Sequence, residues 1–222
     1  MFQHQFINGT GFDYPLGKIV AIGRNYAEHA KELNNPIPSE PILFIKPATA
    51  AVDMHQPFSI PQGKGAVHHE LEIALLIGKT AKNITAQNAW DYVAGIGLGL
   101  DLTLRDVQDK LKEKGHPWEK AKAFDGANPL SHWLLPSAIA DKHNISLQLT
   151  KNGEVKQSGN SNMMITSIPE LLAYASSFFT LQPGDVVMTG TPAGVGALNS
   201  GDELMADLNG ILQVTTHVRH VR

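Results

Sequence analysis

Cysteine is absent from the 222-residue chain. Without cysteine, neither a disulfide nor a thiolate metal site can form, and a reducing compartment is permitted. The N-terminal segment 1–14 carries polar residues where a signal peptide needs an apolar core, and the longest apolar runs are far shorter than a membrane span. We therefore expect a cytoplasmic protein without a membrane partner.

The chain also lacks an excess of one charge, because 18 Lys and Arg stand against 21 Asp and Glu. No block of like charges occurs, which argues against a nucleic-acid partner. The length and a hydrophobic content of 42% favour one folded domain over residues 1–222. A proline-rich stretch, residues 34–41, sets off residues 1–50 as a candidate N-terminal lid subregion.

Short apolar runs and frequent turn residues predict many short strands and few helices. Strands are predicted at residues 18–23, 70–77, 93–100, 185–188, 203–208 and 211–218, with a hairpin at 145–157 turning on Asn152-Gly153. Helices are predicted at residues 26–33, 103–114 and 168–179, the last with a capping box of Ser167 and Glu170. The order does not follow regular βαβ units, so the expected fold class is α+β and β-rich.

Three carboxylates are the strongest chemical signal in the sequence. Glu70 and Glu72 alternate with apolar residues in a predicted strand, so their side chains point the same way. Such neighbours repel each other unless a cation lies between them, and oxygen ligands suit Mg²⁺, Mn²⁺ or Ca²⁺. Asp101 follows a glycine-rich strand and could join them. A solvated strand face and a helix N-cap are the alternatives for these positions.

Several longer segments together resemble the fumarylacetoacetate hydrolase family, especially its short single-domain acylpyruvase and oxaloacetate decarboxylase branch. The matching segments are GRNYAEHAKEL (23–33), FIKPATA (44–50), HHELEIALLIGK (68–79), GLDLTLRDVQDKLKEKGHPWEKAKAFDG (99–126) and GDVVMTGTPAGVG (184–196). The resemblance implies a mixed β-sandwich roll with a short N-terminal lid helix, and a homodimer. It also implies that Glu70, Glu72 and Asp101 bind Mg²⁺, with Mn²⁺ as the alternative.

The resemblance further assigns roles around this metal site. Catalytic roles are implied for His29, Glu32, Gln108 and Lys122, and substrate contacts for Arg24, Lys46, Arg105 and Thr191. By spacing alone, the i,i+3 pairs His29–Glu32 and Arg105–Gln108 equally fit exposed helix faces. Lys122 equally fits a surface lysine, and Thr191 a turn residue.

The function expected from the resemblance is hydrolysis of the C–C bond of an acylpyruvate, a 2,4-diketo acid, through a metal-bound pyruvate enolate. In that reaction His29, oriented by Glu32, activates a water. Decarboxylation or tautomerisation of oxaloacetate, or isomerisation of a 2-hydroxyhepta-2,4-diene-1,7-dioate, would use the same site. A metal-dependent nuclease and a non-catalytic metal-binding protein are more remote alternatives, the nuclease because the chain has no basic patch.

Overall fold

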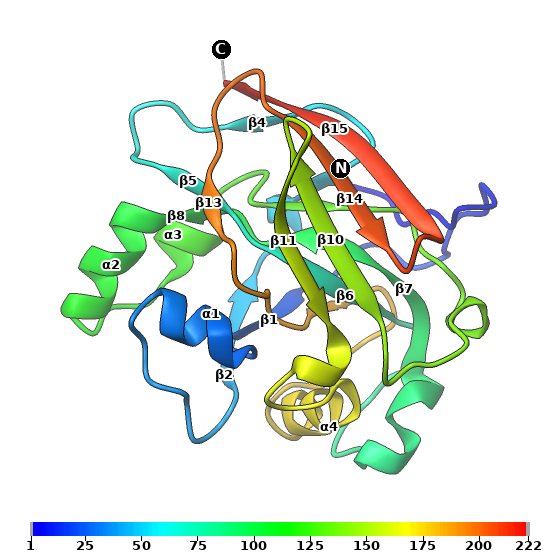
Figure 1. The fold of residues 1–222 in the computed structure, drawn as a ribbon. Helices are drawn as coiled ribbons and strands as arrows, with labels where there is room; N and C mark the ends of the chain where they lie inside the picture. The colour runs from blue at the N-terminus through cyan, green and yellow to red at the C-terminus, as the bar shows by residue number, and fades with distance from the viewer. Residues whose placement is uncertain (1, 221–222) are drawn as a thin grey trace.

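The computed structural model describes residues 2–220 and contains three sheets (Figure 1). The largest has seven strands in the order β2 (Ile42–Lys46), β1 (Ile19–Gly23), β12 (Val186–Met188), β6 (Leu71–Ile77), β7 (Val93–Leu100), β9 (Asn128–Leu130) and β3 (Ala51–Asp53). The second has the order β11 (Glu154–Asn160), β10 (Ser146–Lys151), β14 (Glu203–Leu208), β15 (Leu212–His220) and β4 (Phe58–Ile60). The third has the order β13 (Gly196–Ala197), β5 (Val67–His69) and β8 (Thr103–Leu104).

Four α-helices accompany these sheets within the described residues. They are α1 (Ala27–Glu32), α2 (Arg105–Glu113), α3 (Glu119–Lys122) and α4 (Ile168–Phe178). Figure 1 shows α1, α2 and α3 gathered at one side of the molecule, while α4 lies apart from them and packs against the 3-10 helix η2 (Ala86–Tyr92). The α+β, β-rich fold class is therefore confirmed.

Strand β6 lies at the centre of the largest sheet, and all of its residues are buried. Leu71, Ile73 and Leu75 belong to one apolar cluster, whereas Ala74 and Leu76 on the opposite face belong to a second. Because both faces are covered, every residue of the strand except Glu72 is apolar.

The antiparallel pairing of β6 and β7 positions the predicted ligands. Leu71 pairs with Leu100, so the start of β6 lies beside the end of β7. The backbone N–H of Asp101 donates to the carbonyl of Glu70 at 2.8 Å. Asp101 is therefore held next to Glu70 by the sheet itself. The helix N-cap alternative for Asp101 is wrong, because Leu104 occupies the N-cap of α2.

Glycine in β7 permits a close approach, as the alternation of glycine with apolar residues predicts. A Cβ atom at Gly95 would lie 2.8 Å from the Cβ of Trp133, a fully buried side chain. Any larger residue at this position would force the two segments apart.

Most of the predicted elements are confirmed. Helix α4 begins at a capping box in which the backbone N–H of Ser167 donates to Glu170 Oε2 at 3.0 Å. The hairpin of β10 and β11 turns at Asn152, whose φ of 52° is the left-handed conformation expected there. The helix predicted from residue 103 begins instead at Arg105, because Thr103 and Leu104 pair with β5 as strand β8.

Residues 1–50 do not pack as a separate element. Strands β1 and β2 are part of the seven-stranded sheet, with β1 between β2 and β12. Only α1 and the segment that follows it, residues 33–41, remain as a candidate lid.

The single-domain prediction is untested and stays a prediction. Each helix in residues 2–220 is too short or too polar to span a bilayer.

The N-terminal segment is fastened by His4, which is buried. Its Nε2 donates to the carbonyl of Gly184 at 3.0 Å, and its Nδ1 accepts from Trp133 Nε1 at 3.1 Å. We expect His4→Ala to lower the free energy of unfolding by about 1–3 kcal/mol, because it leaves the buried Nε1–H of Trp133 unpaired. The carbonyl of Gly184 then keeps only the longer bond from the backbone N–H of Gly17, at 3.4 Å.

The contribution of His4 should also depend on pH. Burial lowers the pKa of His4 below its ordinary value of 6.5, although the hydrogen bond to Gly184 raises it in part. The unfolded chain then binds a proton before the folded one, so this stability is present above pH 6.5 and is lost as the pH falls below it. Urea unfolding at pH 7.5 and 5.5 should show a smaller difference between wild type and His4→Ala at the lower pH. A larger difference there would contradict this account, and the exposed His143→Ala serves as control.

Candidate active site

Three buried carboxylates meet at the junction of β5, β6 and β7. Glu70, Glu72 and Asp101 each offer an oxygen within 4.8 Å of the others, and their exposed fractions are 4%, 2% and 1%. Glu70 lies between β5 and β6, Glu72 within β6, and Asp101 directly after β7. The solvated strand face is therefore excluded for this acidic pair.

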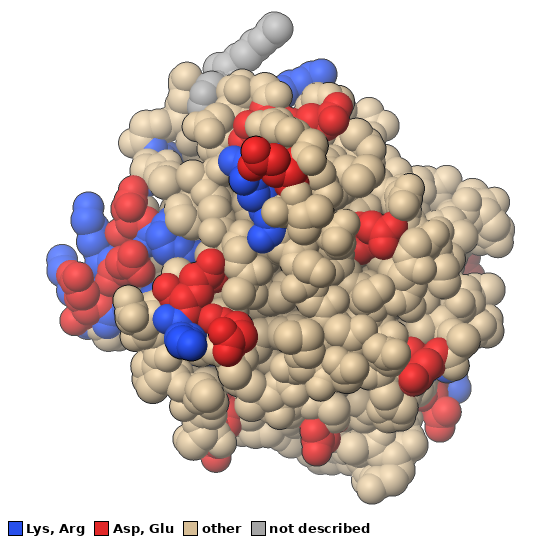
Figure 2. All heavy atoms as spheres, in the orientation of Figure 1, with Lys and Arg blue, Asp and Glu red and all other residues tan. Residues whose placement is uncertain are grey.

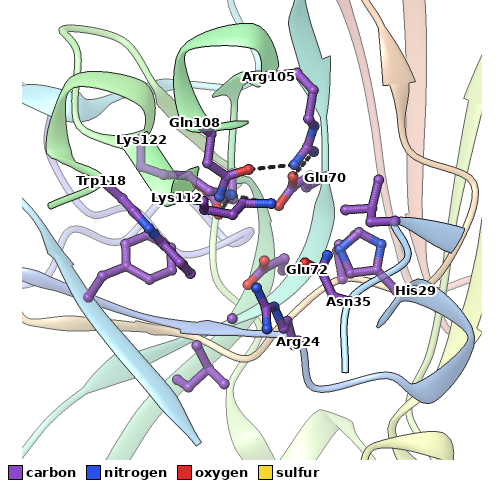
Figure 3. A pocket seen from close by; sticks show the side chains of 16 residues that line it. Arg24, His29, Asn35, Glu70, Glu72, Arg105, Gln108, Lys112, Trp118 and Lys122 are labelled. Carbon is purple, nitrogen blue, oxygen red and sulfur yellow. Dashed lines mark hydrogen bonds and ion pairs between the residues drawn. The ribbon is translucent and has the colours of Figure 1, made fainter. Parts of the chain in front are cut away.

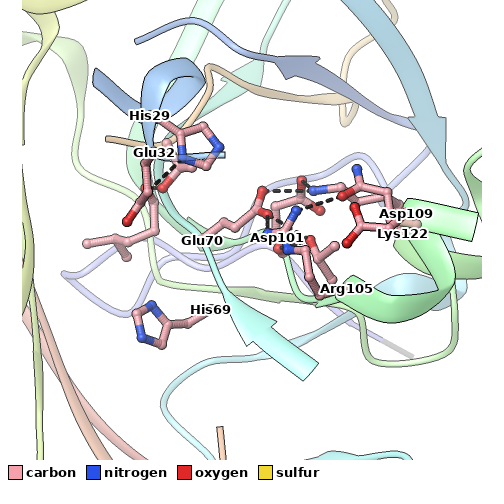
Figure 4. A network of polar contacts seen from close by, with 12 residues as sticks. His29, Glu32, His69, Glu70, Asp101, Arg105, Asp109 and Lys122 are labelled. Carbon is pink, nitrogen blue, oxygen red and sulfur yellow. Dashed lines mark hydrogen bonds and ion pairs between the residues drawn. The ribbon is translucent and has the colours of Figure 1, made fainter. Parts of the chain in front are cut away.

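Two of the carboxylates are held by a network of buried cations (Figure 4). Lys122 Nζ, at the end of α3, donates to Glu70 Oε2 at 2.8 Å and to Asp101 Oδ2 at 2.6 Å. Arg105 pairs with Glu70 Oε1. Burial alone would raise the pKa of Glu70, but Lys122 and Arg105 outweigh it and hold that pKa well below its usual range. Glu70 is therefore ionised and fixed in place.

Arg105 and Gln108 share one face of α2, as their spacing predicts, and both are buried. Arg105 Nη1 donates to Gln108 Oε1 at 2.6 Å. The exposed-face alternative for this pair is wrong. Lys122 is also buried, so the surface-lysine alternative is wrong as well.

Glu72 is the carboxylate that most needs a further positive charge. Its Oε2 accepts the backbone N–H of Gly190 at 2.7 Å. Burial, together with the charge of Asp101, raises the pKa of Glu72 well above its usual range. A divalent cation among the three carboxylates would offset this repulsion, and an all-oxygen donor set suits Mg²⁺ or Mn²⁺. The residues present therefore fit a hard divalent cation.

A second group of potential ligands, Asp53, His55 and His132, does not fit a metal in the same way. His55 Nε2 already accepts the backbone N–H of His132 at 3.2 Å. In a neutral imidazole the other ring nitrogen then carries the proton and has no lone pair to offer. The two rings also stack on each other, with centroids 3.9 Å apart.

Helix α1 brings His29 and Glu32 to the same pocket. His29 Nδ1 lies 3.3 Å from Glu32 Oε2, and the other carboxylate oxygen of Glu32 accepts the backbone N–H of Gly194 at 3.0 Å. Because a carboxylate only accepts, the Nδ1 atom carries the proton and the Nε2 atom keeps a lone pair. His29 is buried and lines the pocket with Glu70 and Glu72 (Figure 3), so an exposed helix pair is excluded.

The pocket wall contains two cations outside the buried network, Arg24 and Lys112. Arg24 has a φ of 59°, a strained backbone conformation for a residue with a side chain. Burial lowers the pKa of Arg24, and no carboxylate within residues 2–220 offsets this effect. Lys112 Nζ lies 3.3 Å from Asp109, which is exposed. Both positive charges are therefore available to an anionic ligand.

Sequence reasoning missed Lys112, although Arg105, Gln108 and Lys112 follow the i, i+3, i+7 stripe of one helix face. It also missed Asn35, Trp118 and Phe44, for which no local spacing gives a signal. The cavity volume is about 30 Å³, room for only two or three water molecules. An oxo acid can therefore enter only if α1 or pocket side chains move.

Lys46 and Thr191, two of the predicted substrate contacts, make hydrogen bonds within the protein. Lys46 is fully buried, and its Nζ donates to Asp101 Oδ1 at 2.5 Å and to the carbonyl of Ala127 at 2.8 Å. It therefore supports Asp101 from behind and is not among the residues of the pocket wall. Thr191 does reach the pocket, but its hydroxyl donates to the carbonyl of Leu71 at 2.7 Å, which leaves no hydrogen for a substrate.

Fold and site together define a β-rich protein with a carboxylate cluster suited to a divalent cation inside a small polar pocket. The chain belongs to the fumarylacetoacetate hydrolase family, since residues 18–219 match the family described as Fumarylacetoacetate (FAA) hydrolase C-terminal. The resemblance of its sequence segments to this family is therefore confirmed.

Similar proteins place the chain in the single-domain branch of the family. It is 52% identical over 212 residues to oxaloacetate tautomerase YcgM of Escherichia coli, covering 95% of this chain and 96% of that protein. It is 45% identical over 196 residues to the mitochondrial oxaloacetate tautomerase FAHD1 of Bos taurus, covering 88% and 89%. The crystal structure of fumarylpyruvate hydrolase from Pseudomonas aeruginosa in complex with Mn²⁺ and pyruvate superposes with a TM-score of 0.92 at 33% identity, covering 99% of this chain and 96% of that one.

Proposed function

We propose that this protein is an enzyme that interconverts the keto and enol forms of oxaloacetate or a close dicarboxylic 2-oxo acid. The observation that carries the proposal is the charge of the pocket. Lys46, Lys122 and Arg105 pair with the carboxylates of the cluster. Arg24 and Lys112 add positive charge to the pocket wall, and Lys112 pairs only with the exposed Asp109. A substrate with two carboxylates matches this surplus better than one with a single carboxylate. Similarity to oxaloacetate tautomerases supports the same substrate.

Glu70, Glu72 and Asp101 would hold the divalent cation, Mg²⁺ or Mn²⁺, which when bound polarises a carbonyl oxygen as a Lewis acid. His29 Nε2 has the free lone pair needed to accept a proton from C3 of the substrate. Glu32 stabilises the imidazolium that this transfer creates, because it accepts the Nδ1–H.

Lys122 is suited to the oxygen on C2. Burial lowers the pKa of Lys122, but the carboxylates of Asp101 and Glu70 raise it above its ordinary value, so the group is an ammonium. Two of its three hydrogens go to these carboxylates. The third is free to donate to the substrate oxygen as charge develops there. In the keto-to-enol direction the C3 proton thus moves to His29 while the C2 oxygen gains a proton from Lys122. Proton exchange with solvent then returns His29 to the neutral imidazole and Lys122 to the ammonium, and the opposite direction uses the same transfers in reverse.

Hydrolysis of an acylpyruvate is the second candidate, and the His29–Glu32 pair favours it. A histidine oriented by a carboxylate can deprotonate a water as readily as a carbon acid, and the similar fumarylpyruvate hydrolase supports this reaction. A nuclease is not favoured, because Lys and Arg lie among Asp and Glu on the face in Figure 2. The homodimer and the cytoplasmic location stay predictions.

Parallel assays distinguish the two reactions. Purified protein with Mg²⁺ or Mn²⁺ should speed the decay of the ultraviolet absorbance of enol-oxaloacetate, and the loss of acetylpyruvate should be slower at equal concentration. Faster cleavage of acetylpyruvate would overturn the tautomerase assignment in favour of the hydrolase. Activity on neither substrate would overturn both.

Lys112 supplies a specific test of dicarboxylate selection. We expect Lys112→Met to raise KM for oxaloacetate about 5-fold, the loss of one partly exposed ion pair of about 1 kcal/mol, because the ammonium contacts the second carboxylate. KM for acetylpyruvate, which has no second carboxylate, should change less than about 2-fold. Lys110→Met, an exposed lysine of the same helix, is the control. An equal rise of both KM values would show that Lys112 does not bind the second carboxylate.

A further inference from the structure

Gln157 lies on β11 of the second sheet and is only 1% exposed. Its side chain contacts two segments that carry pocket residues. Its Oε1 accepts the backbone N–H of Leu71 at 3.0 Å and lies 3.0 Å from His69 Nδ1. Its Nε2 donates to Thr191 Oγ1 at 2.7 Å and to the carbonyl of Pro192 at 2.9 Å. These contacts use both hydrogens and both lone pairs of the amide.

The loop that Gln157 grips, residues 190–194, contacts two different functional groups. At one end, the backbone N–H of Gly190 donates to Glu72 Oε2 at 2.7 Å. At the other end, the backbone N–H of Gly194 donates to Glu32 Oε1 at 3.0 Å. The position of this loop therefore decides the orientation of a candidate metal ligand and of the partner of His29 at the same time.

The loop has little freedom at its first residue. Gly190 has a φ of 96°, and a Cβ there would lie 2.7 Å from the Cβ of Asn25. Between the two glycines, Thr191 donates its only hydroxyl hydrogen to the carbonyl of Leu71, and Gln157 occupies its lone pair. Gln157 and Thr191 thus together join Leu71, which lies between the two glutamates, to the loop, and Gln157 contacts both partners.

We propose that Gln157 is a positioning residue that couples the carboxylate cluster to the His29–Glu32 pair through the 190–194 loop. It touches no pocket space itself and acts through the two glycine amides. The role in turnover rests on the proposed function, whereas the role in orienting the loop does not. Contacts of this kind around metal ligands typically change metal affinity or activity by roughly 10–100-fold.

The test compares Gln157→Met, which keeps the length of the side chain and removes all four contacts, with Gln148→Met on the neighbouring strand β10. Gln148 is half-buried and makes none of these contacts. For Gln157→Met we expect Mn²⁺ affinity to fall roughly 10–100-fold, kcat for oxaloacetate to fall by a similar factor, and KM to change less than about 3-fold. Gln148→Met should change none of these quantities.

Hydrogen exchange measured without substrate provides a readout independent of activity. The amides of Gly190 and Gly194 should exchange faster in Gln157→Met, and Gln157→Asn, which keeps a shorter amide, should recover part of the protection. A folded Gln157→Met with wild-type Mn²⁺ affinity, kcat and exchange would overturn the proposal, as would a lower melting temperature alone. If wild type shows no turnover, the proposed function fails, and Mn²⁺ affinity and exchange still decide the role of Gln157.

Discussion

Glu72→Gln should abolish high-affinity Mn²⁺ binding and lower kcat for oxaloacetate roughly 10³-fold or more. The change removes one of three carboxylates that share one site, and it keeps the size of the side chain. A neutral amide can still accept the backbone N–H of Gly190, so the loop need not move. Isothermal titration with Mn²⁺ and steady-state assays measure the two losses.

The same substitution should leave the metal-free protein as stable as wild type or more stable. Burial and the charge of Asp101 disfavour an ionised Glu72, so removing that charge relieves repulsion. A carboxylate whose role was structural would behave in the opposite way, and its loss would lower the melting temperature without affecting Mn²⁺. Glu203→Gln, an exposed carboxylate on β14, should change neither quantity. Undiminished Mn²⁺ binding by Glu72→Gln would refute the proposed cation site.

The sequence predicts the acidic cluster because all three carboxylates lie on or directly beside two strands that pair with each other. Glu70 and Glu72 are two residues apart on an extended chain, and Asp101 follows the strand that pairs with them. The apolar runs of β6 and β7 make both strands predictable, and their antiparallel pairing needs only one register. The roles of these residues were implied by the family resemblance and remain proposals for this chain.

The network around the cluster could not be predicted in the same way. Lys46 contacts Asp101, 55 residues away, and Gln157 contacts Thr191, 34 residues away. Neither lysine nor glutamine has a local signal that separates a buried partner from an exposed one. Lys46 is turned inward because β2 belongs to the largest sheet. Gln157 is turned inward because β11 lies beside the 190–194 loop. Lys46 therefore contacts Asp101 and not the pocket, where a contact with substrate was expected.

His29→Gln should lower kcat for oxaloacetate tautomerisation by roughly 10²–10⁴-fold, the usual contribution of a positioned proton-transfer group. Glutamine cannot accept and return a proton, although it can still hydrogen-bond to Glu32. Mn²⁺ affinity should change less than about 3-fold, because His29 is not one of the three carboxylate ligands. Stopped-flow decay of enol-oxaloacetate and titration with Mn²⁺ measure the two quantities on the same preparation, with the exposed His116→Gln as control.

The size of the loss separates the two candidate reactions. In tautomerisation His29 touches the substrate carbon directly, whereas in hydrolysis it acts on a water between imidazole and carbonyl. If acetylpyruvate hydrolysis is lost and oxaloacetate tautomerisation survives in His29→Gln, the imidazole serves only the water. The C3 proton must then go to a water or to another group of the pocket, because Lys122 is held as an ammonium by Glu70 and Asp101 and has no lone pair to accept it. If both reactions fall together, one histidine on α1 serves both, and the choice between them depends on whether the distal part of the substrate carries a charge for Lys112 to bind.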